Sequence, residues 1–135
     1  SNLTATENLM IFAKLRGDSE NSVKEALKLV NLPYNDKKLF GKYSLGMKQK
    51  LGIALALLNH PKLVILDEPM NGLDPKAVKN VRETIIDFKN QGVTFLISSH
   101  ILSELVKVTD SILIIDKGKI VTDKKLNNFR LKWVL

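Results

Sequence analysis

The stretch LVILDEPMNGLDP, residues 63–75, decides the fold of this chain. Residues 63–66 form a short continuous apolar run, which predicts a strand buried on both faces of a parallel sheet. Two acids, Asp67 and Glu68, follow directly and emerge at the carboxyl end of this strand. Ligands of open α/β sheets bind beyond this end of the strands. The stretch therefore predicts an α/β layer with a site at its edge.

Asp67 and Glu68 suit a complex of Mg²⁺ with phosphate. One carboxylate can hold the metal or its waters while the next polarises an attacking water. A lone Asp-Glu pair at a strand end more often only solvates a turn. Here Pro69 follows at once, and the segment NGLD (71–74) leads into a helix that opens with Pro75. This combination favours the functional interpretation.

A histidine follows the next predicted strand. The helix that opens at Pro75 ends at Gly92, residues 93–97 make a second buried strand, and His100 comes just after it. A lone histidine is more often an ordinary hydrogen-bonded or exposed residue. At the same sheet edge as the two acids, however, a neutral imidazole can donate to a phosphate oxygen or orient the water. We therefore include His100 in the candidate site.

The first 60 residues are predicted to be helical, with three helices limited by capping hydroxyls and by helix breakers. The predicted limits are Thr4 or Thr6 to Gly17, Ser19 or Ser22 to Pro33, and Ser44 to Asn59. Beyond His100, residues 101–108 predict a short helix, 111–116 a third strand and 119–122 the second arm of a hairpin.

The predicted fold class is thus α/β, with a mainly parallel sheet, flanking helices and a C-terminal hairpin. We expect a helical subdomain at 3–60, an α/β core half at 61–122 and a basic tail at 123–135 that needs a partner surface to be ordered.

The composition is that of about one domain, since 135 residues are 44% hydrophobic and contain no cysteine. Neither a secretion signal nor the roughly 18 uninterrupted apolar residues of a membrane span is visible, so we expect a soluble, cytoplasmic protein. The net charge of +7 can indicate nucleic acid, a membrane surface or an anionic ligand. The lysines are scattered among acids, which favours solvated helix faces.

The stretch YSLGMKQK, residues 43–50, contains Gly46. Gly41 and Gly46 have the spacing of the two glycines in a phosphate-binding P-loop. The match fails, because Met47 stands where lysine is required and Gln49 where serine or threonine should bind Mg²⁺. No other glycine pair fits. The stretch does offer the Ser44 hydroxyl and backbone N–H groups at a helix N-terminus, which favour an anion, although a plain N-cap explains them equally well.

With these motifs in order, the chain resembles the second half of an ATP-binding cassette (ABC) nucleotide-binding domain, a P-loop NTPase fold, over nearly all of residues 3–122. LVILDEP resembles the Walker B strand with its catalytic glutamate, NGLDP the D-loop, ISSH the switch histidine and YSLGM the family signature. LTATENLMIFAKLRG together with YSLGMKQKLGIALAL looks most like the bacitracin or lantibiotic export and immunity branch of bacterial transporters.

The resemblance implies a role for each acid and for the histidine. Asp67 would hold Mg²⁺ through water, Glu68 would be the general base, and His100 would contact the γ-phosphate of ATP. Asp74 would help to couple the two sites of a dimer.

The resemblance also implies that cassettes pair head to tail, with each ATP between the P-loop of one subunit and the signature of the other. The signature segment here is Ser44, Leu45, Gly46 and Met47, of which Ser44 and Gly46 would touch the partner's γ-phosphate. Leu45 and Met47 replace a glycine and the glutamine of the common signature, and Leu45 adds bulk near a phosphate. Met70 stands where threonine or serine is usual, a milder change.

The family's Walker A strand, P-loop, adenine-stacking aromatic and Q-loop glutamine have no counterpart in these residues. We therefore expect a truncated or proteolysed piece of a longer cassette, inactive by itself, with a natural half-cassette as the less favoured alternative.

The implied partners are a transmembrane permease subunit, met through the helical subdomain, and a second ATPase domain in a homodimer or heterodimer. We expect the protein at the inner face of the cell membrane, powering export of a peptide antibiotic or drug. The alternatives are a non-transport ABC-type module acting on the ribosome or nucleic acid, and an inert pseudo-enzyme, against which the intact Asp67, Glu68 and His100 argue. For the favoured transporter we expect no nucleic-acid partner.

Overall fold

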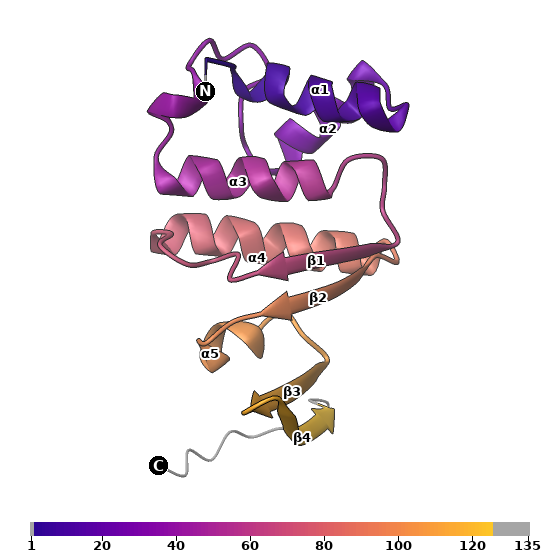
Figure 1. Cartoon of the computed structure of the whole chain (residues 1–135), viewed down its shortest axis with the longest axis vertical. Coiled ribbons are helices and arrows are strands. Elements are labelled where there is room, and N and C mark those ends of the chain that lie inside the picture. Colours follow the sequence, from indigo (N-terminus) through magenta and orange to yellow (C-terminus); the bar gives the residue numbers. More distant parts are fainter. Residues whose placement is uncertain (1, 126–135) are drawn as a thin grey trace. The chain divides into compact units, whose positions relative to one another are not determined.

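The computed structural model describes residues 2–125, and the chain divides after Ser98 into two compact units. Figure 1 shows the helices and strands of both units in chain order. The first unit contains every element from α1 to β2, and the second contains α5, β3 and β4. Of the predicted site residues, only His100 belongs to the second unit.

Three helices open the first unit: α1 (Ala5–Arg16), α2 (Glu20–Leu29) and α3 (Leu45–Ala56). Each begins at a hydroxyl that accepts a hydrogen bond from the first turn, as the sequence predicts. At α1 the Thr4 hydroxyl accepts from the Glu7 N–H, and the Glu7 carboxylate accepts from the Thr4 N–H in return. This capping box satisfies two backbone donors that the helix itself leaves unpaired.

The other two candidate cap residues serve tertiary contacts. Thr6 lies inside α1, and its hydroxyl donates to the Tyr34 carbonyl. Ser22 lies inside α2, and its hydroxyl accepts from the Asn59 N–H at 3.1 Å. The caps are therefore Thr4 and Ser19, and the second hydroxyl of each pair ties a helix to a later loop.

The strand pair of the first unit is β1 (Leu63–Asp67) and β2 (Thr94–Ser98), which are joined by α4 (Pro75–Asn90). The two strands run parallel, in a register that pairs Leu63 with Thr94 at one end and Asp67 with Ser98 at the other. This confirms the predicted parallel α/β arrangement.

The core of the first unit lies between the helices. Helices α1, α2 and α3 contact one another, while α3 contacts β1 and α4 contacts β2. The largest fully buried side chains come from α1, α2 and α4, and they are Leu9, Val23, Leu27 and Ile85. Burying each such side chain contributes about 1.5–3 kcal/mol.

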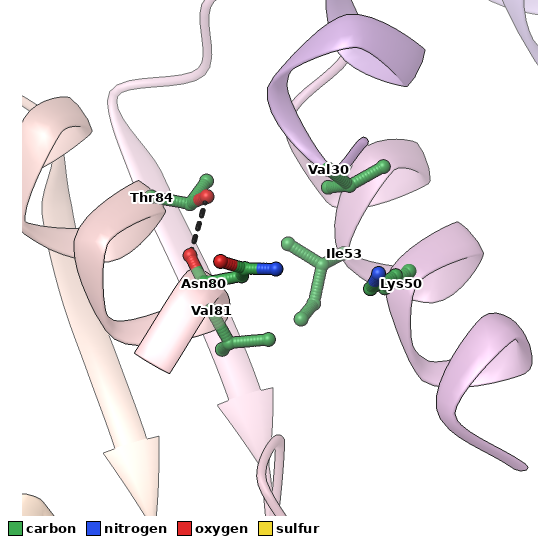
Figure 2. Close-up of a pocket in the computed structure, with 6 residues that line it drawn as sticks. All are labelled: Val30, Lys50, Ile53, Asn80, Val81 and Thr84. Atoms are coloured by element: carbon green, nitrogen blue, oxygen red, sulfur yellow. Dashed lines mark hydrogen bonds between the residues drawn. The ribbon is translucent and has the colours of Figure 1, made fainter. Parts of the chain in front are cut away.

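A buried polar contact joins α4 to the end of α2. The Thr84 hydroxyl lies 2.9 Å from the Asn80 carbonyl on its own helix and 3.1 Å from the Leu29 carbonyl. Figure 2 shows Thr84 and Asn80 beside a small cavity that Ile53 of α3 and Val30 also line. The cavity measures about 10 Å³, which is room for about one water and no larger ligand.

The prediction that β1 is buried on both faces is wrong for this structure. Val64 and Leu66 are buried, whereas Leu63 and Ile65, which point to the opposite face, are 55% and 65% exposed. Leu96 of β2 is likewise 57% exposed. An apolar run indicates that its side chains favour burial, but it does not specify what covers them. Within the described residues only one face of the strand pair is covered.

The second unit contains the short helix α5 (Leu102–Leu105) and a hairpin of β3 (Ser111–Asp116) with β4 (Lys119–Lys125). The hairpin confirms the prediction. Its turn residues Lys117 and Gly118 both have positive φ, 48° and 76°, as a tight two-residue turn between antiparallel strands requires. The helix is shorter than the predicted 101–108, and most of the predicted tail, 126–135, lies outside the described residues.

Among residues 2–125 no helix has both the length and the apolar character needed to cross a membrane.

Candidate functional site

The two parallel strands end together, and their last residues are linked. Asp67 and Ser98 are register partners, and the Ser98 hydroxyl donates to Asp67 Oδ1. One residue further, the Glu68 N–H donates to the Ser98 carbonyl at 3.0 Å. The sheet thus holds the Asp67 carboxylate at its carboxyl edge, where the side chain is exposed to solvent.

Glu68 has a backbone conformation that a residue with a side chain seldom adopts. Its φ of 47° lies in the left-handed region, which costs on the order of 1–3 kcal/mol for a residue other than glycine. The turn beyond it compensates, because the Asn71 N–H donates to the Glu68 carbonyl at 3.1 Å and the Leu73 N–H to the Met70 carbonyl at 3.3 Å. Strain of this kind tends to persist where a side chain must be aimed for function.

Asp74 ends this turn and caps the next helix. Its Oδ1 accepts from the Ala77 N–H at 2.7 Å, and Pro75 occupies the first helical position. Both features are those of a stable helix start, since proline lacks the N–H that would be unpaired there. Asp74 is therefore a structural cap of α4.

Ser44 caps α3 in the same way. Its hydroxyl oxygen accepts from the Met47 N–H at 3.2 Å, so the N-cap predicted from the sequence is present. This bond uses the oxygen and leaves the hydroxyl proton to donate elsewhere. The helix start can therefore still offer an O–H and backbone N–H groups to an anion.

Two lysines lie near the start of α3. Lys38 Nζ lies 3.8 Å from Met47 Sδ, and Lys48 Nζ lies 5.4 Å from the centre of the Phe40 ring. A cation at this distance from an aromatic face is attracted to it. Both contacts hold positive charge close to a helix end that already favours anions.

Tyr43 packs next to the start of α3. Its side chain is buried, and its ring lies 5.9 Å from that of Phe40. Burial raises the pKa of the Tyr43 hydroxyl above its ordinary value, and the nearby Asp36 carboxylate raises it further. A buried aromatic residue thus directly precedes the Ser44 cap of α3.

The structure brings the start of α3 and the turn before α4 into contact. A Cβ placed on Gly46 would lie 3.4 Å from Leu73 Cδ2, and one placed on Gly72 would lie 2.2 Å from Leu45 Cδ2. The segments 44–47 and 71–74 are therefore neighbours, although about 25 residues separate them. His100 is exposed in the second unit, and its place at the site stays a prediction from the sequence.

The acids fit a magnesium ion that is held mainly by other groups. Among the described residues no cluster of three or more histidines or acids could hold a metal ion by itself. Mg²⁺ commonly takes one or two carboxylates and completes its shell with water and substrate phosphate. An exposed Asp67, fixed by Ser98, suits that minimal role.

Sequence reasoning missed two features of this region. The segment ISSH by itself points to His100, whereas the parallel register makes Ser98 the partner of Asp67. Pairing the ends of the two predicted strands would have found it. The contact between Leu45 and Gly72 depends on tertiary packing, and no local pattern signals it.

The chain is similar to known proteins over most of its length. The family model described as "AAA domain, putative AbiEii toxin, Type IV TA system" matches residues 7–106. The chain is 51% identical over 125 residues to the bacitracin transport ATP-binding protein BcrA of Bacillus licheniformis, covering 91% of this chain and 41% of that protein. It is 48% identical over 124 residues to the lantibiotic transport ATP-binding protein SrtF of Streptococcus pyogenes, covering 92% and 54%. It thus spans about half the length of these curated relatives.

Solved structures agree in fold. A structure described as the ATP binding subunit of an ABC transporter superposes with a TM-score of 0.80 at 33% identity, covering 93% of this chain and 54% of that one. The ADP conformation of the ATP-binding cassette MJ1267 superposes with a TM-score of 0.78 at 21% identity, covering 92% and 56%.

Proposed function

The chain belongs to the AAA domain family and is part of an ABC transporter ATP-binding domain of the bacitracin and lantibiotic transport type, and we propose that it supplies one side of an ATP-hydrolysing site. The observation that carries this proposal is the pair Asp67 and Glu68 at the shared carboxyl edge of two parallel strands. The P-loop of such a site comes from outside the 135 residues, because no stretch within them matches its sequence.

Each acid has a separate task in this proposal. Asp67, held by the Ser98 hydroxyl, helps to coordinate Mg²⁺ through water. Glu68, aimed by its unusual backbone conformation, takes the proton of the attacking water. Bound Mg²⁺ would neutralise charge on the transferred phosphate. His100 is proposed to donate to the γ-phosphate.

The signature segment acts on a nucleotide that a second ATPase domain carries. We assign the Ser44 hydroxyl and the backbone around Leu45, Gly46 and Met47 to that γ-phosphate, because this helix start carries no acid and has lysines beside it. Asp74 couples the two sites through the turn that it ends. The active assembly is thus a homodimer or heterodimer of ATPase domains.

The helical subdomain is proposed to meet the permease. Three large apolar side chains of α1 are exposed together: Ile11 at 47%, Phe12 at 40% and Leu15 at 79%. Leu15 lies four residues after Ile11 and three after Phe12, so it neighbours both of them on one side of the helix. An exposed apolar strip of this kind suits a groove in a partner subunit. We propose the domain limits 3–60, 61–122 and 123–135 because the helical part would contact the permease and the α/β part would carry the acids of the ATP site.

The transported substrate is proposed from the two relatives, which are transport proteins for bacitracin and a lantibiotic. We propose that the complete gene product that carries this sequence powers export of a peptide antibiotic at the inner face of the cell membrane. The relatives favour this over a module that acts on the ribosome or nucleic acid.

The test compares the complete gene product with its Glu68→Gln variant. The wild type is expected to hydrolyse Mg-ATP, and the variant to lose about 10²–10⁴-fold in kcat because the general base is gone, while it still binds ATP. Lys76→Gln, an exposed change in the first turn of α4, is the matched control with no expected loss. An active Glu68→Gln enzyme would remove the general base from the proposal.

A second measurement tests the isolated chain. Isothermal titration of the 135 residues with Mg-ATP is expected to give no appreciable binding, because no P-loop is present. A dissociation constant on the order of micromolar would contradict the proposal that the nucleotide is carried elsewhere.

A further inference from the structure

Two leucine–glycine pairs in opposite order meet at the candidate site. Leu45-Gly46 opens α3, and Gly72-Leu73 lies in the turn before α4. The Leu45 side chain lies over Gly72, and the Leu73 side chain lies over Gly46. Each glycine thus gives room to the leucine of the other pair. We call these four residues the interlock.

A side chain at Gly72 would meet the end of the Leu45 side chain, which is itself 57% exposed. A Cβ there would lie 2.2 Å from Leu45 Cδ2 and 3.4 Å from Leu45 Cγ, and the first of these distances requires Leu45 to move. Gly72 also has a φ of 72°, which strains any residue with a Cβ. The Gly46 side is looser, since a Cβ there would lie 3.4 Å from Leu73 Cδ2.

The interlock sits between the groups to which the proposed function gives chemistry. Ser44, the cap of α3, directly precedes Leu45, and Asp74, the cap of α4, directly follows Leu73. The same turn is bonded to Glu68 through the Asn71 N–H. A shift of α3 along its axis would therefore pull Leu45 off the turn that the catalytic acid begins.

We propose that Leu45 is a positioning residue whose side chain fixes the start of α3 against the acid-bearing turn. This rests on the proposed function and deepens it: Leu45 acts through the turn, and its backbone remains with the phosphate-facing groups. Catalytic groups must be held within about 0.5 Å of their productive places, and a displacement of about 1 Å can cost about 100-fold in rate. The Leu45 side chain therefore links the start of α3, which faces the nucleotide of the second domain, to the turn that begins at Glu68.

The functional test uses steady-state ATP hydrolysis by the complete gene product. Leu45→Ala is expected to lower kcat about tenfold or more and to leave KM for ATP within about twofold, because the groups that bind the nucleotide remain but the start of α3 is no longer fixed against the turn that begins at Glu68. Leu45→Met keeps a side chain of similar volume that reaches Gly72, and it is expected to restore at least about half of kcat.

The packing test is a double-mutant cycle on the unfolding equilibrium of the complete gene product. Gly72→Ala and Gly17→Ala place a Cβ at nearly the same backbone conformation, φ of 72° and 74°, but nothing lies within 4 Å of the Gly17 position. Backbone strain alone is expected to raise the unfolding constant roughly 5–30-fold in both. Gly72→Ala should lose about threefold more, and Leu45→Ala should recover that excess in Gly72→Ala only.

The outcomes separate the two proposals. If the wild type hydrolyses no ATP, the proposed function fails while the packing cycle still reports on the interlock. If the wild type is active and Leu45→Ala matches it in kcat, the positioning role is overturned. Equal unfolding constants for the two glycine variants, with no rescue by Leu45→Ala, overturn the interlock itself.

Discussion

The two helices that start at the candidate site are capped in chemically different ways. At α4 the cap is a carboxylate, Asp74, whereas at α3 it is a hydroxyl, Ser44. The other α-helices of the described residues have an acid in their first turn: Glu7 in α1, Glu20 in α2 and Glu104 in α5. Only α3, among the α-helices in residues 2–125, begins without a carboxylate at its cap or in its first turn.

The difference shows which helix end is available to an anion. A carboxylate cap satisfies the backbone donors of α4 and cancels part of the positive charge at its N-terminus. The Ser44 cap satisfies one donor of α3 and adds no negative charge, while Lys38 and Lys48 add positive charge nearby. The caps thus stabilise the N-termini of both helices, but only the N-terminus of α3 remains favourable for an anion.

Giving α3 a carboxylate cap is expected to have the largest effect. In the complete gene product, Ser44→Asp keeps a good N-cap but places a negative charge where the γ-phosphate is proposed to lie. ATP-dependent association of two ATPase domains should weaken about 100-fold or more, since like charges brought together cost several kcal/mol. Analytical ultracentrifugation with Glu68→Gln as the non-hydrolysing background measures it. Ser44→Thr, a neutral cap, serves as the control, and unchanged association in Ser44→Asp would refute the anion site.

Removing the carboxylate cap of α4 is expected to have an intermediate effect, on stability. Asp74→Ala loses the bond to the Ala77 N–H and should lower the free energy of unfolding by about 1 kcal/mol. Asp74→Asn, which keeps a capping oxygen without the charge, should recover most of this loss. Urea unfolding of this chain followed by circular dichroism gives the values. Equal stability of all three proteins would show that the cap contributes nothing.

The smallest expected effect is a pH dependence beside α3. Burial raises the pKa of Tyr43, so the folded chain holds this proton more tightly than the unfolded chain does. The contribution is fully present below the unfolded pKa of about 10 and is lost as pH rises through the higher folded pKa. The difference in unfolding free energy between wild type and Tyr43→Phe should therefore fall above about pH 10. A difference that stays constant to higher pH would contradict this.

Local physics made both helix starts predictable. A hydroxyl or carboxylate before an apolar-periodic run marks a cap whatever surrounds it, so Ser44 and Asp74 could be read directly, and Thr4 or Ser19 with one competitor each. The hairpin turn at Gly118 was also predictable locally, because glycine readily adopts the positive φ that such a turn needs. The order of Asp67, Glu68 and Asp74 along the chain likewise located the acid-bearing turn.

Features that depend on partners distant in the chain were not predictable in this way. Whether Ile65 is covered depends on a neighbouring layer, which a run of apolar letters does not specify. The hydrogen bond between Ser98 and Asp67 needs the strand register, and the fit of Leu45 over Gly72 needs the distance between two helices. Sequence patterns indicate whether a residue favours burial and which local conformation it favours. They do not indicate which distant residues it contacts in the packed structure.

The open face of β1 and β2 has a practical consequence for handling the chain in solution. Leu63, Ile65 and Leu96 are exposed apolar residues on strands whose outer edges no other strand pairs within residues 2–125, and copies of the chain can add at such edges. Light scattering of the purified chain should therefore grow faster than in proportion to protein concentration, and a lysine at position 65 should suppress that growth. Dilution is therefore expected to limit self-association of the chain more than cooling does.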